Sequence, residues 1–188
     1  GQNYWSSAGL YWYEAPDNPK ANNWARHTIV TGLTYVANIE LGDIDKDGDL
    51  DLAMITYTWS GGTVNWSECP TNPAASSAWA ATTVQSGVQY GYDIHLSDIN
   101  WDGYLDMVYT IQYYDVCWLK NPVANPKNGG GWTKYTIVSF SGPWHYPHGL
   151  CVKDIGGDGY MDVVFSTYYT NALYWYECPD DPMKEAWI

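Results

Sequence analysis

Positive charge is the scarcest property of this sequence of 188 residues. It contains 8 lysines and arginines against 21 aspartates and glutamates, which gives a formal net charge of −13. A nucleic acid is therefore not an expected partner, because phosphate binding needs clustered basic residues. The sequence also lacks any apolar run of about 18 residues, so we expect no membrane insertion.

Cysteine is also rare, with Cys69, Cys117, Cys151 and Cys178 as its only members. Four cysteines are compatible with free thiols or with up to two disulfides. Cys69 and Cys178 hold the same place in different repeats of the chain, so their Cα atoms should lie too far apart to be bridged. We expect the cysteines to be small buried apolar residues, and the disulfide state stays open.

Aspartate, by contrast, is concentrated in three loops of one pattern. The loops begin at Asp43, Asp98 and Asp154, which places them 55 and 56 residues apart. Glycine stands at position 6 of each loop and aspartate at position 9. Segments that recur at an almost fixed spacing indicate a repeat protein whose repeat unit carries the loop.

The oxygen-bearing residues of these loops predict calcium sites. Calcium takes six to eight oxygen ligands, and side chains at positions 1, 3, 5 and 9 together with the carbonyl of position 7 can converge on one ion. The alternative is a metal-free acidic turn, in which the carboxylates would repel one another. The predicted ligands are Asp43, Asp45, Asp47, Asp49 and Asp51 in the first loop, Asp98, Asn100, Asp102, Tyr104 and Asp106 in the second, and Asp154, Asp158, Tyr160 and Asp162 in the third.

The three predicted Ca²⁺ sites are not equal. At position 3, Asn100 keeps an oxygen ligand but loses a charge, and Gly156 supplies no side-chain ligand at all. We therefore expect affinity to fall from the first loop to the third. An EF-hand is excluded, because Met54 stands at position 12 of the first loop where an EF-hand has glutamate.

Other landmarks keep the same period and define the fold class. Trp12, Trp66, Trp118 and Trp175 each precede a proline by four residues. Each repeat contains four strand-like runs and no helical pattern, which is typical of a β-propeller blade. We predict an all-β propeller of about three and a half four-stranded blades, cut as a half blade at 1–26 and repeats of about 54 residues at 27–80, 81–134 and 135–188. A solenoid or stacked sandwich is the alternative.

The Asp-x-Asp-x-Asp-Gly-x-x-Asp loop between strands resembles the FG-GAP/VCBS repeat family, which occurs in integrin α-subunit propellers, fungal propeller lectins and secreted bacterial proteins. The Tyr-Trp-Tyr-Glu-x-Pro rhythm around Trp12 and Trp175 is similar to that of VCBS-type proteins. The resemblance covers nearly the whole chain and implies calcium-binding blades. The third loop departs from the family pattern because it lacks the ligand at position 3.

A partial ring would leave strand edges uncovered. The chain starts in mid-blade and stops where a last strand should begin. We therefore expect a piece of a longer protein or one protomer of an assembly, with the ring completed by self-association or by further blades of the same polypeptide.

In a propeller the acidic loops share one face with the connections that follow the third strands. The opposite face is rich in aromatic and imidazole side chains, which suit stacking on sugar rings. The alternative is that these rings pack between blades. The candidate ligand-binding residues are Trp144, His145, Tyr146, His148, Tyr90, Tyr92 and Tyr35.

The sequence therefore favours an extracellular, secreted, calcium-stabilised binding or assembly module, with a glycan or an extracellular protein as its partner. One alternative is the propeller domain of a polysaccharide-active enzyme, a lyase or a sugar dehydratase, in which His95, His145 or His148 and nearby tyrosines would transfer protons. The other alternative is a structural subunit of an extracellular polymer. No residue spacing here is specific for catalysis.

Overall fold

The computed structural model describes residues 7–76, 79–113, 115–142 and 145–188. In these residues the chain is all-β, with 13 strands in four antiparallel sheets. They contain no α-helix, and the single helical element is a 3-10 turn at Pro126–Asn128. None of these residues forms a helix that is long and apolar enough to cross a membrane.

The four sheets follow one another along the chain. Sheet 1 contains β1 (Ser7–Glu14) and β2 (Ala25–Thr34); sheet 2 contains β3 (Val36–Gly42), β4 (Asp51–Thr56), β5 (Gly62–Ser67) and β6 (Ala81–Val88); sheet 3 contains β7 (Gly91–Ser97), β8 (Asp106–Ile111), β9 (Asp115–Lys120) and β10 (Thr133–Ser139); sheet 4 contains β11 (Pro147–Lys153), β12 (Asp162–Thr167) and β13 (Leu173–Tyr176). Within each sheet, neighbours in sequence are neighbours in space. Each acidic loop joins the first and second strands of its sheet, as the sequence predicts.

The sheets are offset from the sequence repeats. β6 pairs with β5 in sheet 2, although its residues open the repeat 81–134. The offset arises because the repeats are cut before the fourth strand, whereas each sheet begins at the strand that enters the acidic loop.

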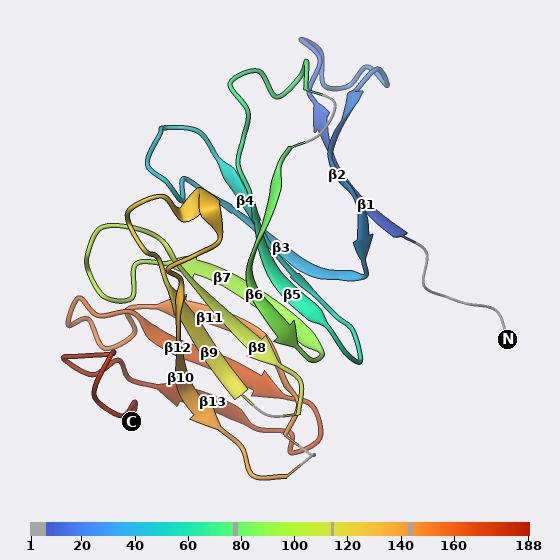
Figure 1. The fold of residues 1–188 in the computed structure, drawn as a ribbon. Coiled ribbons are helices and arrows are strands. Elements are labelled where there is room, and N and C mark those ends of the chain that lie inside the picture. Colours follow the sequence, from blue (N-terminus) through green and yellow to red (C-terminus); the bar gives the residue numbers. More distant parts are fainter. Residues whose placement is uncertain (1–6, 77–78, 114, 143–144) are drawn as a thin grey trace, which may run out of the picture.

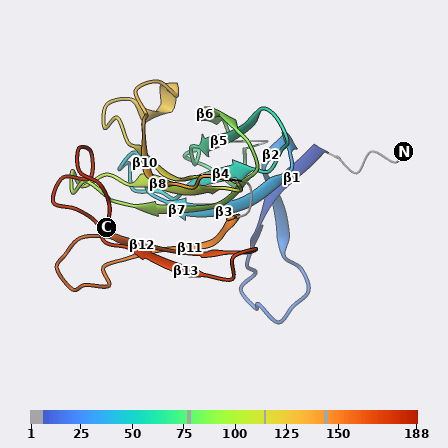
Figure 2. The same cartoon turned by 90° about the horizontal axis from the view of Figure 1, so that it is seen from below.

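The first strands of successive sheets lie side by side. β3 contacts β7, and β7 contacts β11, so the sheets are arrayed from β1–β2 to β11–β13 (Figure 1; Figure 2). Among the described residues the sheets do not close into a ring or a barrel. The fold is therefore an all-β array of antiparallel sheets, and the propeller stays a prediction.

A hydrophobic core lies between each pair of neighbouring sheets. Trp66 and Trp118 are fully buried in the cores on either side of sheet 3. Trp12 packs at the junction of sheets 1 and 2, where its ring stacks on His27 at 4.3 Å. The periodic tryptophans are thus core residues, except for Trp175, which no described sheet covers.

The four cysteines are free thiols. Cys69, Cys117 and Cys178 are buried, as expected for small apolar residues, and Cys151 is exposed on β11. Burial raises the pKa of the Cys117 thiol to about 11, so this cysteine stays protonated and unreactive at neutral pH.

Candidate functional site

The three acidic loops share one backbone conformation. Positions 4 and 6 of every loop have positive φ, a region that L side chains rarely adopt, which explains why glycine recurs at position 6. The φ values are 63° for Lys46, 56° for Trp101 and 75° for Gly157 at position 4, and 99° for Gly48, 86° for Gly103 and 95° for Gly159 at position 6.

The aspartate at position 9 of each loop is fully buried and fastens the loop to the sheet. Asp51 Oδ2 accepts the backbone N–H of Ile44 at 3.1 Å, and its Oδ1 accepts that of Cys69 at 2.9 Å. Asp106 and Asp162 repeat both contacts in their own sheets. The sequence predicts these residues as metal ligands, and the structure adds a role in holding the end of the third strand.

The first loop brings carboxylates together in a way that fits a cation. One oxygen each from Asp43, Asp45 and Asp51 lie within 4.8 Å of one another. Asp43 Oδ1 is buried and has no hydrogen-bond partner among the described residues. Burial also raises the pKa of Asp51 to about 6. Orphaned oxygens and buried acids are costly without a positive charge beside them, so these residues suit a hard divalent ion.

A second acidic group adjoins the first. Oxygens of Asp45, Asp47 and Glu68 also lie within 4.8 Å of one another. The ammonium of Lys127, which comes from the connection between β9 and β10, pairs with Asp45 at 2.9 Å and also with Glu68. Glu68 was not predicted from the sequence. It follows β5 directly, at the end of the sheet that carries the acidic loop, and this position could have identified it as a further acidic residue of the site.

The second loop carries its own positive charge. Lys120 Nζ lies 2.5 Å from Asp102 Oδ2, and the Asn100 amide donates to the same oxygen at 3.0 Å. Asp98 Oδ1, at position 1, is buried without a hydrogen-bond partner in the described part of the chain. The second loop therefore still has one carboxylate oxygen without a hydrogen-bond donor, but its surroundings are less acidic than those of the first loop.

The third loop is closed by its own backbone. Asp154 accepts the N–H of Gly157 at 2.6 Å and the N–H of Gly159 at 3.0 Å, so both of its oxygens are engaged. The bond from position 6 recurs in the other two loops, whereas the bond from Gly157 at position 4 is found only in the third among the described residues. Asp43 and Asp98 differ in this respect, since each keeps one oxygen without a hydrogen-bond partner among the described residues; the order of calcium affinity stays a prediction.

The loops touch one another through positions 4 and 7. The ammonium of Lys46 lies 4.5 Å from the Tyr104 ring, and the rings of Trp101 and Tyr160 are 4.3 Å apart. The side chains of Tyr104 and Tyr160 therefore pack between loops, and only their carbonyls could serve as ligands. The acidic loops and the connections after the third strands share one end of the sheets.

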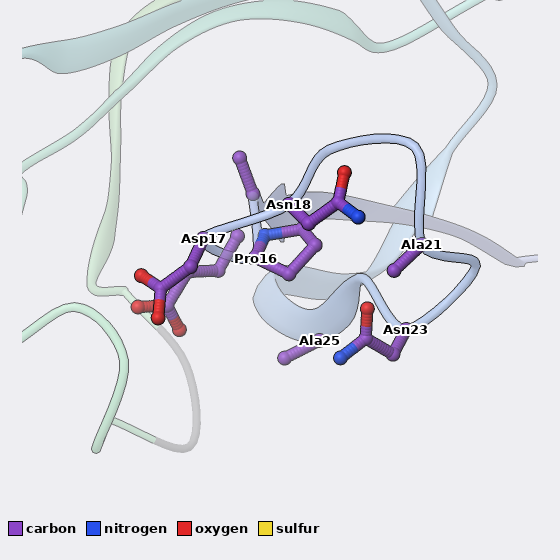
Figure 3. Close-up of a pocket in the computed structure, with 8 residues that line it drawn as sticks. Pro16, Asp17, Asn18, Ala21, Asn23 and Ala25 are labelled. Atoms are coloured by element: carbon purple, nitrogen blue, oxygen red, sulfur yellow. The ribbon is translucent and has the colours of Figure 1, made fainter.

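The connection between β1 and β2 forms an open pocket of about 390 Å³ at the corresponding place in sheet 1. Figure 3 shows Asp17 at one side of it and the amides of Asn18 and Asn23 at the other, with Pro16 between. Its lining contains no acidic loop. This pocket consequently lacks the set of carboxylates that leads us to predict a cation site at the first loop.

The opposite end of the sheets carries a continuous line of aromatic rings. The tyrosine row consists of Tyr35, Tyr57, Tyr90, Tyr113, Tyr146 and Tyr169, whose successive ring centroids are 5.6, 5.1, 5.0, 4.1 and 4.5 Å apart. It runs from sheet 2 to sheet 4. Rings at these separations attract one another through their edges and faces.

Three tyrosines of the row stand directly before a first strand and have left-handed backbones. The φ angles of Tyr35, Tyr90 and Tyr146 are 24°, 51° and 49°. Each carbonyl accepts a backbone N–H from the residue after the second strand, at 2.9, 2.9 and 3.1 Å. The repeat thus places a ring at the same corner of each sheet.

Beside the row lies an open pocket of about 460 Å³. It is lined by Tyr35, Ala37, Asn38, Tyr57, Tyr92, Asp93 and Gly149. The Asn38 amide donates to Asp93 Oδ1, and Asp93 Oδ2 accepts the backbone N–H of Leu150 at 2.8 Å. Asp93 on β7 therefore connects β3 to β11, and its carboxylate is fixed at the pocket wall.

The structure brings five of the seven predicted ligand-binding residues together. Of these, Tyr35 and Tyr92 line the pocket, while Tyr90 and Tyr146 lie within the row. His148 stacks on Tyr92 at 3.7 Å, and burial lowers its pKa, so its ring is neutral at pH 7. These five side chains belong to one surface.

Of the two remaining predicted residues, the structure describes only His145, which does not join that surface. His145 stacks on Phe140 at 4.3 Å, against the core of sheet 4, and Trp144 lies outside the described residues. The sequence analysis missed Tyr57, Asn38 and Asp93. Asn38 and Asp93 stand 55 residues apart, which is the repeat spacing, so their equivalence could have been noticed.

No protein-family model matches this chain, and no curated protein is detectably similar to it.

Proposed function

We propose that this chain is a calcium-stabilised sheet-repeat module that binds a glycan in the pocket beside the tyrosine row. The observation that carries the proposal is the lining of that pocket, in which three tyrosine rings stand next to a fixed amide and a fixed carboxylate. Sugar rings present C–H faces that stack on aromatic rings and hydroxyl groups that donate to carboxylates.

The charge of the pocket narrows the ligand class. Asp93 is the one acidic side chain among the lining residues, and no lysine or arginine takes part. An anionic sugar would meet a carboxylate without a counter-charge. The proposal therefore concerns neutral sugars in preference to uronic acids or sulfated sugars.

The proposed architecture is a β-propeller of the FG-GAP/VCBS type. The support is the side-by-side packing of β3, β7 and β11, together with the division of loops into an acidic end and a tyrosine end. Calcium would bind the first loop most tightly, since oxygens of Asp43, Asp45 and Asp51 converge there within 4.8 Å of one another. Loops of this kind suit extracellular calcium, so a secreted protein is the proposed setting.

Titration calorimetry with a panel of neutral and acidic oligosaccharides tests the function. Tyr35→Ala should weaken binding by about 1–2 kcal/mol, roughly tenfold, because one stacking surface is lost. Tyr169→Ala is the matched control, since both side chains are 51% exposed and only Tyr35 lines the pocket. Equal losses in the two variants, or no binding of any neutral sugar by the parent chain, would contradict the proposal.

A further inference from the structure

The outer face of sheet 4 is apolar and uncovered. We call Val164, Leu173 and Trp175 the C-terminal face. Trp175 is 51% exposed and Leu173 is 74% exposed. The equivalent residues of the two preceding sheets are fully buried, namely Ala53, Val64 and Trp66 in sheet 2 and Val108, Val116 and Trp118 in sheet 3. Sheet 4 therefore exposes apolar residues at positions that a neighbouring sheet buries in sheets 2 and 3.

The equivalent faces of sheets 2 and 3 show which kind of surface packs against the C-terminal face. Ile94 and Leu119 of sheet 3 belong to the core that buries Trp66. Leu150 and Phe165 of sheet 4 belong to the core that buries Trp118. At both junctions the covering surface is the opposite face of a further sheet with the same repeat.

The chain exposes a surface of that covering kind at its other end. We call Tyr11 and Tyr13 of β1 the N-terminal face; both are exposed, and they lie on the face of β1 opposite to Leu10 and Trp12, which pack against sheet 2. Tyr13 is equivalent to the buried Leu119, and Tyr11 is equivalent to the buried Cys117. In Figure 1 sheets 1 and 4 lie at opposite ends of the array.

We propose that the C-terminal face of one copy docks on the N-terminal face of a second copy of this chain. Both halves of a sheet-to-sheet junction are thus exposed on a single chain, which makes the chain self-complementary from head to tail. Such a contact joins two different patches and is heterologous. The net charge of −13 opposes association, so the contact should be tested at physiological salt, where repulsion over long distances is screened.

The first test is sedimentation velocity of the whole chain with calcium over a wide range of concentration. The mass should rise from 21.2 kDa toward at least twice that value. Trp175→Glu and Tyr13→Glu should each raise the dissociation constant by at least about tenfold, because a buried aromatic anchor is replaced by a charge. Trp59→Glu is the control, since Trp59 is 76% exposed and lies on neither face; its dissociation constant should not change.

The second test uses the asymmetry of the contact. Trp175→Glu retains an intact N-terminal face, and Tyr13→Glu retains an intact C-terminal face, so a mixture of the two should form a heterodimer that neither forms alone. Leu173→Glu serves as a second variant of the C-terminal face if Trp175→Glu fails to fold, as judged by circular dichroism. A wild-type chain that stays monomeric overturns the proposal. So does association that Tyr13→Glu leaves unchanged, because two C-terminal faces would then be meeting each other.

Discussion

Replacing Asp162 by asparagine tests whether the position-9 aspartates fasten each acidic loop to its own sheet independently of any metal. The Asp162 carboxylate accepts three backbone N–H groups, from Cys178 at 3.0 Å, Ile155 at 3.0 Å and Gly156 at 3.2 Å. It is fully buried, and it belongs to the loop whose Asp154 oxygens are already occupied by backbone donors. Asp162 therefore isolates the structural role.

The magnitude follows from the hydrogen bonds. Asparagine has nearly the same volume, so no cavity forms, but its single oxygen cannot accept on both sides. If that oxygen faces Ile155 and Gly156, the amide NH₂ is directed at the N–H of Cys178, and one buried donor is left unsatisfied. A lost charge-assisted bond and an unsatisfied donor together cost about 3 kcal/mol. For a chain of this size that lowers Tm by roughly 6–12 °C.

Thermal unfolding followed by circular dichroism with a chelator present measures the effect. Asp158→Asn is the matched control in the same loop, because Asp158 is exposed and accepts one N–H, from Tyr160 at 2.9 Å, which an asparagine oxygen can still accept. The control should change stability by less than about 0.5 kcal/mol. If Asp162→Asn costs no more than Asp158→Asn without metal, the fastening role is wrong.

Two further results are expected. Calcium should raise Tm by mass action. Asp43→Asn should remove most of that increase, and Asp154→Asn should remove little of it. Equal losses in calcium titrations of the two variants would contradict the predicted order of calcium affinity among the loops. The hydrogen bond to Glu40 raises the pKa of His95 above 6.5, so the pair stabilises the fold fully below pH 6.5, and this contribution disappears as the pH rises through the folded-state pKa of His95. Urea midpoints measured across this pH range should fall in the wild type and stay flatter in His95→Gln; identical slopes would exclude the pair as the cause.

Local sequence signals predicted the strands and loops of this chain well. The Asp-x-Asp-x-Asp-Gly pattern placed the loops between first and second strands, because glycine at position 6 and an acidic run specify a tight turn. Trp66 and Trp118, which mark the period in the sequence, are both buried between sheets. These features could be predicted because each depends on a few residues that are close in sequence and recur at a fixed spacing.

The sequence predicted the candidate site less well, because its residues meet only when sheets pack. The Asn38–Asp93 contact joins side chains of separate sheets, and Tyr57, directly after β4, contacts Tyr90, directly before β7. His145 carries the same imidazole as His148, but it packs on Phe140 whereas His148 stacks on Tyr92, and composition alone does not separate the two. Trp175 is likewise exposed because no described sheet packs against it, although its position in the repeat is the same as that of the buried Trp66 and Trp118.

The left-handed tyrosines also limit how this chain can vary. At Tyr35, Tyr90 and Tyr146 the backbone would be relaxed by glycine, since a non-glycine residue at positive φ costs on the order of 1 kcal/mol. Glycine would, however, interrupt the line of rings, and most other aromatic or branched residues would keep the strain and lose the hydroxyl. Few single substitutions satisfy both demands, so we expect saturation mutagenesis to find these three corners among the least tolerant exposed or half-buried positions of the chain.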